Sequence, residues 1–430
     1  MSDNQDTLAL WSQYGDLYNE IVRPDRKYTI SHYMRTRWAP QLGAARLWFV
    51  TALRQRCFWN NKQDWCIVDK DTLARESGLS LRTVNRIISR ADEAGDESSS
   101  ADRDEWTSWF FDKKRRRRYN QRIGRTVNAP NRYHVLIDDP LTPDDQAALA
   151  RLLQQELSGN DPEDTLRALQ RICDRPDPLL HKGPSPAAAS TDEDPFLLAG
   201  AFTFDIVQAL CPMPDRENAL YVSIARAASQ LHNAITRPER VYMGNQYFRL
   251  QWLPDLGPTL ALLIIDLRAR CYWNKRTGQL RDTCQATWAE LAREMGCTTR
   301  QLRNLRQNEV LDAFFEILDE GRGRAPSQFR VHMFDPLTMP DQKHFETRTK
   351  AQGQLDVDPE TGQIDMYRAL QAESATGSEP RSAEEMASGA TEKAEFLAPS
   401  AAEDAEVLAP RERKFWHLEG LNAEILAPQP

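Results

Sequence analysis

The sequence contains one passage twice, and this internal repeat constrains the fold more than any local feature. The longest aligned segments lie 214 residues apart without a gap, and 16 of their 38 positions are identical. A repeat of more than 100 residues is too long for a solenoid unit and has the size of an independent domain. The sequence therefore predicts two duplicated domains. The aligned pairs are 23–60 with 237–274, 73–78 with 291–296, and 129–146 with 325–342.

Segments outside the repeats predict where each domain ends. Residues 142–157 are rich in Ala, Leu and Gln and predict a closing helix, with Thr142 as its cap and Pro143 at its first position. Residues 174–196 are rich in Pro, Ala, Ser and acidic side chains, which is typical of a linker. We therefore expect a first domain at 1–157, a linker at 158–202, a second domain at 203–350 and a tail at 351–430.

Charge is distributed unevenly along the chain. The 430 residues carry a net charge of −8, but residues 351–430 alone hold 16 acids and 6 bases. The first 350 residues are nearly neutral, so any basic surface on them must be locally concentrated. The N-terminus has no signal-peptide pattern, no run of 18 apolar residues occurs, and the seven cysteines form no C-x-x-C pair. These features favour a reduced, cytoplasmic protein that does not cross a membrane.

One repeat, read alone, predicts an α+β fold that is mostly α. Apolar spacing indicates a helix at 43–58, followed by a β-like run. Two short helices come next, one capped by Asp69 and ended by Gly78, the other capped by Ser80. The later segments are an aromatic run at 106–111, a basic loop at 113–125 and an alternating strand at 132–137.

Two helices joined by a turn containing Gly are the signature of a helix-turn-helix. LARESGLSLRTVNRIISR at 73–90 has this pattern, and LAREMGCTTRQLRNLRQ at 291–307 repeats it, with a capping box at Thr287 and Glu290. With the flanking strands, these segments resemble the winged helix-turn-helix family of DNA-binding proteins. The duplicated arrangement is similar to that of replication initiators of plasmids and other mobile elements. The resemblance covers 43–137 and 257–333.

The resemblance implies that a recognition helix enters the major groove in each repeat. In the first repeat Leu81, Val84 and Ile88 would face the core. Arginine suits bidentate contact to guanine, and asparagine suits adenine. A merely solvated helix face would explain the same polar residues. The candidate DNA-contacting residues are Arg82, Thr83, Asn85 and Arg86 in the first repeat and Arg300, Gln301, Arg303 and Asn304 in the second.

The resemblance also implies a wing that meets the DNA backbone or the minor groove. Eight of the 13 residues at 113–125 are Lys or Arg, a cluster suited to neutralising phosphates. A solvated or nuclear-localisation-like run is the alternative. The second repeat has a shorter wing, which we expect to grip the backbone less, to reach a minor groove, or to serve in dimerisation. The candidate wing residues are Lys113, Lys114, Arg115, Arg116, Arg117, Arg118, Arg122, Arg125, Arg322 and Arg324.

Several large side chains occur at equivalent positions in both repeats. Internal ion pairs and phosphate contacts would explain the shared arginines equally well. For the shared aromatic residues, core packing is favoured over stacking on single-stranded nucleic acid. The arginines are Arg35 with Arg249 and Arg54 with Arg268, and the aromatic pairs are Trp38 with Trp252, Trp59 with Trp273 and Tyr33 with Tyr247.

Motifs of the common enzyme classes are missing from the sequence. None of the seven histidines recurs at an equivalent position, and no metal-ligand spacing, P-loop or G-x-S-x-G elbow is present. The sequence therefore predicts a protein that is not an enzyme and needs no cofactor or metal.

The acidic tail repeats a short apolar phrase three times, as AEFLAP, AEVLAP and AEILAP. Its composition predicts disorder, and three apolar motifs on a flexible chain suit docking to a protein partner. Compositional drift, or packing of the tail on its own domains, would also explain the phrases. The tail could in addition compete with DNA for the basic wing. The candidate partner-binding residues are Phe396, Leu397, Val407, Leu408, Ile425 and Leu426.

Together these features predict a cytoplasmic, nucleoid-associated protein that binds double-stranded DNA in a sequence-specific way, with homodimerisation left open. A replication initiator of a plasmid or mobile element is the leading interpretation. A transcriptional or partition regulator would use the same DNA contacts. An interaction scaffold that recruits partners through its tail is the alternative from another class.

Overall fold

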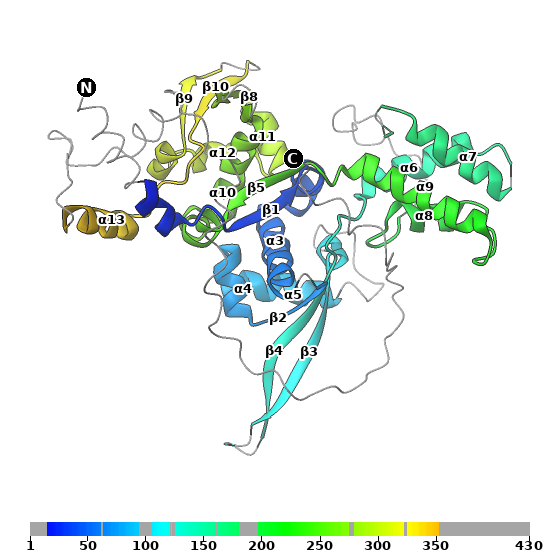
Figure 1. The fold of residues 1–430 in the computed structure, drawn as a ribbon, viewed down its shortest axis with the longest axis horizontal. Coiled ribbons are helices and arrows are strands. Elements are labelled where there is room, and N and C mark those ends of the chain that lie inside the picture. Colours follow the sequence, from blue (N-terminus) through cyan, green and yellow to red (C-terminus); the bar gives the residue numbers. More distant parts are fainter. Residues whose placement is uncertain are drawn as a thin grey trace. The chain divides into compact units, whose positions relative to one another are not determined.

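The fold in this computed structural model is mixed α+β and mostly helical (Figure 1). All described residues belong to one compact unit within residues 1–377. The structure describes residues 15–61, 63–93, 105–120, 122, 125–159, 161–176, 178–179, 197–274, 279–321 and 325–351.

The first repeat begins with a helix at 15–22 and strand β1. A π-helical turn leads through α2 into the long helix α3. Gly43 lies between α2 and α3, and its positive φ of 74° suits glycine. The strand and the two short helices after α3 follow the order that the sequence predicts, and α6 is capped by Thr142 with Pro143 at its first position. The aromatic run begins as a 3₁₀ helix, Glu105–Trp109. The bounds are β1 Lys27–Ser31, α2 Ala39–Leu42, α3 Ala44–Trp59, β2 Trp65–Val68, α4 Lys70–Ser77, α5 Leu81–Glu93, β3 Phe111–Asn120, β4 Arg125–Val135 and α6 Pro143–Glu156.

The second repeat has the same order of elements, with one small hairpin added. Its long helix α10 bends at Gly257, the equivalent of Gly43, with the same φ of 74°. The added hairpin, β6 with β7, fills the place where the two sequences differ in length. The bounds are α9 Ala219–Thr236, β5 Val241–Asn245, α10 Leu253–Arg270, β6 Tyr272–Asn274, β7 Gln279–Arg281, β8 Thr283–Ala286, α11 Trp288–Glu294, α12 Thr299–Leu305, β9 Phe315–Asp319, β10 Ser327–Val331 and α13 Met339–Ala351.

Each repeat builds one three-stranded antiparallel sheet. The strand order is β2-β4-β3 in the first repeat and β8-β10-β9 in the second. Aromatic side chains join each sheet to the helices, since Phe111 packs on Phe49 of α3 with ring centroids 5.4 Å apart. In both repeats the pair of short helices therefore lies between a long core helix and a strand hairpin (Figure 1).

The two repeats pair with each other through β1 and β5, which run antiparallel. In this ribbon Tyr28 lies opposite Gly244, and the buried Tyr28 ring occupies the space that a Cβ at Gly244 would need. Strands β1 and β5 therefore form a two-stranded sheet to which each repeat contributes one strand. Both repeats belong to one compact unit, and their buried residues form one hydrophobic cluster.

The turn glycines of the short helix pairs also lie against the opposite repeat. Gly78 and Gly296 end the first helix of each pair with φ of 63° and 64°. A Cβ at Gly78 would lie 2.9 Å from the Leu253 carbonyl oxygen, and one at Gly296 would lie 2.7 Å from the Pro40 carbonyl oxygen. Each turn needs glycine both for its left-handed backbone and for this close approach.

Buried ion pairs cross the boundary between the repeats. Arg35 of the first repeat pairs with Asp266 of the second. Arg249 of the second repeat has a side chain with no exposed surface, donates to the Glu76 carbonyl oxygen at 3.0 Å and lies 3.9 Å from the Glu76 carboxylate. Burial lowers the pKa of Arg249 to about 10, and the Glu76 charge opposes this shift.

The second pair of shared arginines makes ion pairs within each repeat. Arg54 and Arg268 bind Asp139 and Asp335 at 2.6 Å, and each also donates to two carbonyl oxygens of the segment just before its aspartate. All four shared arginines are therefore internal ion-pair partners. Internal ion pairs therefore explain why these arginines occur in both repeats, and phosphate contact is not needed to explain any of the four.

Most of the shared aromatic residues are buried. Trp38 and Trp252 donate to the carbonyl oxygens of Pro140 and Pro336 at 2.8 and 2.6 Å. Tyr33 and Tyr247 are also buried, as core packing predicts. Trp59 contradicts that prediction, because 47% of it is exposed and it stacks under Arg56 and Arg249. The side chain of Trp273 lies outside the described residues.

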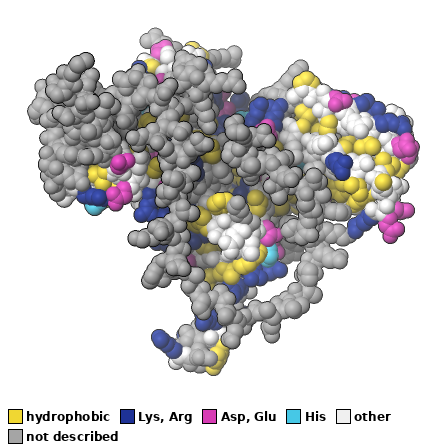
Figure 2. Space-filling view, in the orientation of Figure 1, with side chains coloured by type: hydrophobic (Ala, Val, Ile, Leu, Met, Phe, Trp, Pro, Cys, Tyr) yellow, Lys and Arg dark blue, Asp and Glu magenta, His cyan; other side chains and the backbone are white. Residues whose placement is uncertain are grey.

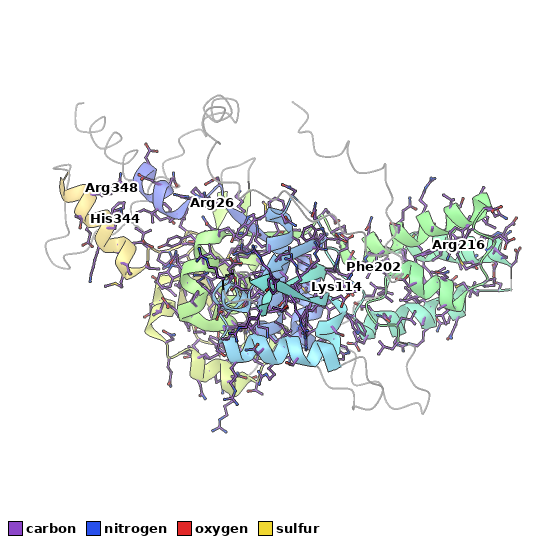
Figure 3. The ribbon with its side chains drawn as sticks, turned by 90° about the horizontal axis from the view of Figure 1, so that it is seen from below. Arg26, Lys114, Phe202, Arg216, His344 and Arg348 are labelled. Atoms are coloured by element: carbon purple, nitrogen blue, oxygen red, sulfur yellow. The ribbon has the colours of Figure 1, made fainter. Side chains whose placement is uncertain are left out.

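The expected linker at 158–202 is partly a helix, which corrects the sequence prediction. Helix α7, Pro162–Cys173, is capped by Asp161 and packs on α9, and α8, Thr203–Leu210, contacts both α6 and α9. Leu169 and Ile172 of α7 are fully buried. The Pro- and Ala-rich segment after this helix led the sequence analysis to assign the whole region to a linker. Helices α6 to α9 form a small bundle, on which Figure 3 labels Arg216 and Phe202.

Helix α13 of the second repeat, the counterpart of α6, contacts the helix at 15–22. Arg348 of α13 donates to Glu20 of the helix at 15–22 at 3.0 Å, and Figure 3 labels Arg348 and His344 beside that helix. Tyr18 donates to the Asp335 carbonyl oxygen at 2.7 Å. The closing helix of the second repeat thus contacts the opening helix of the first.

Among the residues that the structure describes, one helix is long and apolar enough to cross a membrane by length and composition. It spans Phe248–Arg270, and 61% of its most apolar window is buried inside the protein. It contains the buried Asp266 and Arg268, which bind partners in the core. Core packing therefore accounts for its apolar character.

Candidate nucleic-acid interface

The first helix pair presents a small cationic face. Asp69 caps α4 by accepting from the Thr72 amide, and Ser80 caps α5 by accepting from the Thr83 amide at 3.1 Å. Val84 and Ile88 of α5 are buried, which leaves the opposite face of the helix to solvent. Of the four candidates on α5, Arg82 and Arg86 are exposed, and Thr83 and Asn85 are half-buried.

Two details of α5 differ from the sequence prediction. Leu81 is 43% exposed instead of facing the core, because it is the first residue of the helix and lies beyond the packed turn. The side-chain oxygen of Asn85 accepts from Lys70 of α4 at 2.6 Å. Asn85 therefore points partly towards α4, and Arg82 and Arg86 remain as the outward candidates.

The second helix pair is shorter but equally polar outside. The capping box of Thr287 and Glu290 starts α11, as the sequence predicts, and Thr298 caps α12. Leu302 is the buried anchor of α12. The exposed residues of α12 include all four candidates, Arg300, Gln301, Arg303 and Asn304.

The basic run of the first repeat lies in a strand rather than in a loop, which corrects the sequence prediction. It occupies most of β3, which pairs with β4 from Phe111 to Asn120 in a long hairpin with a register shift after Lys114 (Figure 1). We call β3 and β4 the basic hairpin. Consecutive strand residues point to opposite faces, so the hairpin carries positive charge on both of its faces. Figure 2 shows Lys and Arg side chains along this part of the molecule.

The cations of the basic run differ in exposure, because Lys113 at the base of the hairpin is half-buried and the cations after it are exposed. Lys113 is half-buried opposite the fully buried Tyr133, whereas Lys114 lies opposite Arg132, whose guanidinium lies 4.4 Å from the centre of the Trp65 ring. Burial, followed by the nearby Lys114 charge, lowers the pKa of His134 at the base. The exposed cations of the run are Lys114, Arg115, Arg116, Arg117, Arg118, Arg122 and Arg125.

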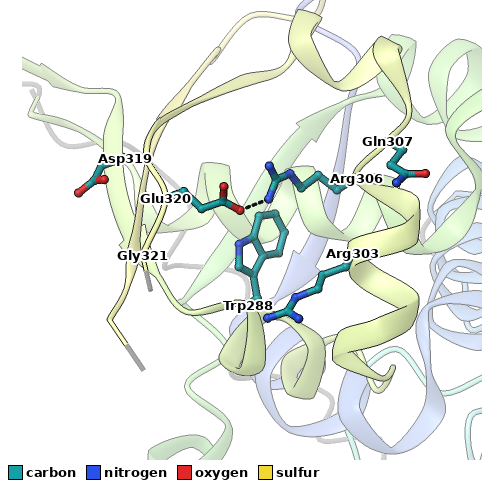
Figure 4. A pocket seen from close by; sticks show the side chains of 7 residues that line it. All are labelled: Trp288, Arg303, Arg306, Gln307, Asp319, Glu320 and Gly321. Carbon is teal, nitrogen blue, oxygen red and sulfur yellow. Dashed lines mark hydrogen bonds and ion pairs between the residues drawn. The ribbon is translucent and has the colours of Figure 1, made fainter. Parts of the chain in front are cut away.

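A groove of about 890 Å³ separates α12 from the end of β9 in the second repeat. Figure 4 shows its side chains, with the ion pair between Arg306 and Glu320 spanning it above the Trp288 ring. The candidate Arg303 also lines this groove. Sequence reasoning missed the groove, because only the fold brings β9 opposite α12. The lining residues are Trp288, Arg303, Arg306, Gln307, Asp319, Glu320 and Gly321.

Some candidates lie outside the described residues. These include both cations of the second wing and all six apolar residues of the tail motifs, so their roles stay predictions. They are Arg322, Arg324, Phe396, Leu397, Val407, Leu408, Ile425 and Leu426.

Comparison of the chain with protein-family models, with curated proteins and with solved structures gave no match in any of the three.

Proposed function

We propose that this protein binds double-stranded DNA in a sequence-specific way through two winged-helix units. The element order supports the proposal, because each repeat has a strand, a helix pair with a left-handed glycine turn, and a two-stranded hairpin closing an antiparallel sheet. The second helix of each pair exposes arginines at positions suited to reading base edges.

The observation that carries the proposal is the unbroken cationic stretch of the basic hairpin. Arg115, Arg116, Arg117 and Arg118 are consecutive and exposed, on a sheet that packs on the same core as α5. Such a stretch is costly for folding alone, since like charges repel, and it suits a polyanion. A hairpin of this kind is the wing that the family resemblance calls for, longer and more cationic than its counterpart in the second repeat.

The experiment measures how the affinity for duplex DNA depends on salt. Each phosphate contact that is lost should reduce the slope of log K against log salt by about 0.9. Changing Arg115, Arg116, Arg117 and Arg118 to Gln should therefore make the slope shallower by about 3.6 if all four contact phosphates. Affinity should fall for every duplex, whatever its sequence, because phosphate contacts carry no sequence information.

A matched variant removes the same charge elsewhere. Gln at four exposed arginines of the α6–α9 bundle changes the net charge equally, so it should leave the slope nearly unchanged. An equal loss in both variants would mean that net charge alone drives binding, and an unchanged slope in the hairpin variant would exclude the hairpin as the wing. The control positions are Arg151, Arg167, Arg216 and Arg226.

Within this class we favour a replication initiator of a plasmid or mobile element. The support is that one chain carries two candidate DNA-binding surfaces that differ from each other. Such a chain suits repeated DNA sites that it binds in one orientation. A map of bound sites separates the alternatives. One cluster of repeats would support an initiator, scattered promoter sites would support a transcriptional regulator, and no enrichment of DNA would support a scaffold.

A further inference from the structure

The groove between α12 and β9 contains a buried hydrogen-bond donor that has no partner among the described residues. Trp288 is 7% exposed, and among the described residues its indole nitrogen Nε1 has no acceptor. Figure 4 shows this nitrogen on the side of Glu320 and Gly321. A buried donor left unpaired costs about 1–3 kcal/mol, so the position favours a state in which an acceptor reaches it.

Two guanidinium groups line the same groove. Arg303 is exposed, and its charge contributes to lowering the pKa of Glu320, after the hydrogen bond and charge of Arg306. Arg306 lies 5.6 Å from the centre of the Trp288 ring and is held by Glu320. An exposed pair of this kind contributes little to stability, about 0–1 kcal/mol, so a stronger anion can replace the carboxylate.

The first repeat also has a cation between its two short helices, but on the first helix of the pair instead of the second. Trp288 corresponds to Lys70, and Arg303 corresponds to Asn85, at the same offset of 218 that aligns the helix pairs. In the first repeat Lys70 donates to Asn85 at 2.6 Å. A positive charge between the helix pair is thus present in both repeats although neither residue is shared.

We propose that this groove is a seat for a phosphate group, held by Arg303 and Arg306 and, through its indole N–H, by Trp288. The proposal rests on the proposed function, because the groove lies between the helix that would enter the major groove and the hairpin beside it, where one DNA strand would pass. Arginine forks match phosphate oxygens in geometry. Glu320 then acts as a competing anion that keeps Arg306 occupied until phosphate arrives.

Three single variants test the seat in the full-length chain. Arg303→Gln should lower the salt slope of duplex binding by about 0.9, because one phosphate contact is lost. Trp288→Phe keeps the ring and removes the donor, so it should weaken binding without changing the slope. Glu320→Gln frees Arg306 and should strengthen binding. Arg330→Gln is the matched control, since Arg330 is an exposed cation of β10 paired with Glu316 outside the groove.

The phosphate could come from the DNA backbone or from a free phosphate compound, and a second measurement distinguishes these sources. The indole ¹⁵N–¹H signal of Trp288, assigned by its loss in Trp288→Phe, is followed during titration with inorganic phosphate. A shift on adding duplex alone supports a backbone seat, and saturable shifts with inorganic phosphate support a seat for a free phosphate compound.

The outcomes separate this inference from the proposed function. If the chain binds duplex but Arg303→Gln behaves like Arg330→Gln and the Trp288 signal moves with neither probe, the seat is refuted and DNA binding stands. If the chain binds no duplex, the proposed function fails, and the phosphate titration alone decides whether the groove holds phosphate.

Discussion

Replacing Glu76 by Gln would remove one charge from the buried network that joins the repeats. Glu76 accepts two hydrogen bonds from Arg56, one of them at 2.9 Å, and its carboxylate lies 3.9 Å from Arg249. The Arg249 side chain has no exposed surface, and the Glu76 side chain is 7% exposed. Glu76→Gln keeps the volume and the neutral contacts to Arg249 but leaves that guanidinium buried beside a neutral group.

The cost of this change should be large. Removing one partner of a buried ion pair typically costs about 3–5 kcal/mol, because the remaining charge stays desolvated. Gln246 still accepts from Arg249 at 2.8 Å, and so does the Glu76 backbone oxygen at 3.0 Å. We therefore expect the lower end of that range, about 3 kcal/mol.

The assay is urea unfolding of the full-length chain, and the repeat supplies a matched control. Glu294 is the counterpart of Glu76, but its side chain is 24% exposed and its partner Arg270 keeps Asp266 at 3.0 Å. Burial and the neighbouring Asp266 raise the pKa of Glu294, so its charge is already disfavoured. Glu294→Gln should cost less than about 1 kcal/mol. Equal costs for the two variants would refute the argument that burial of Arg249 sets the magnitude. Adding Arg249→Gln to Glu76→Gln should recover part of the loss.

Two further predictions concern the contact between the repeats and the response to acid. Gly244→Ala should destabilise the protein by about 1–3 kcal/mol in thermal or urea unfolding, because the new methyl group meets the Tyr28 ring. Gly159→Ala has no heavy atom within 4 Å and should change stability by less than about 0.5 kcal/mol; similar effects of the two would exclude the overlap. Burial lowers the pKa of His232, so the unfolded chain binds more protons and stability should fall as pH drops below about 6.5. His232→Gln should flatten that dependence between pH 7 and 5, and an unchanged slope would assign it to other groups.

Local signals in the sequence predicted the local structure well. Asp69, Ser80 and Thr287 cap the helices that the sequence assigned to them, because a cap is decided by a few neighbouring residues. The sequence predicted a basic loop between an aromatic run and an alternating strand. The basic run is a strand because pairing with β4 satisfies its backbone, while its long side chains stay in water.

Contacts between the repeats were beyond sequence reasoning. Arg35 and Arg249 were seen to be shared, but their partners Asp266 and Glu76 come from the opposite repeat and have no common spacing. The phosphate groove has the same origin, since Glu320 reaches Arg306 only after β9 folds beside α12. A sequence pattern predicts the local conformation and the burial of a residue. It does not predict which residue distant in the sequence will contact it.

Selection of duplexes from a random pool by the full-length chain tests sequence-specific DNA binding. We expect one enriched motif at moderate salt. With Arg82→Ala the preference at one or two of its base pairs should fall, by about 1–3 kcal/mol in discrimination, because Arg82 is an outward candidate of α5. Recovery of no motif by the unaltered chain, or the same preference at every base pair with Arg82→Ala and Arg86→Ala, would contradict the account.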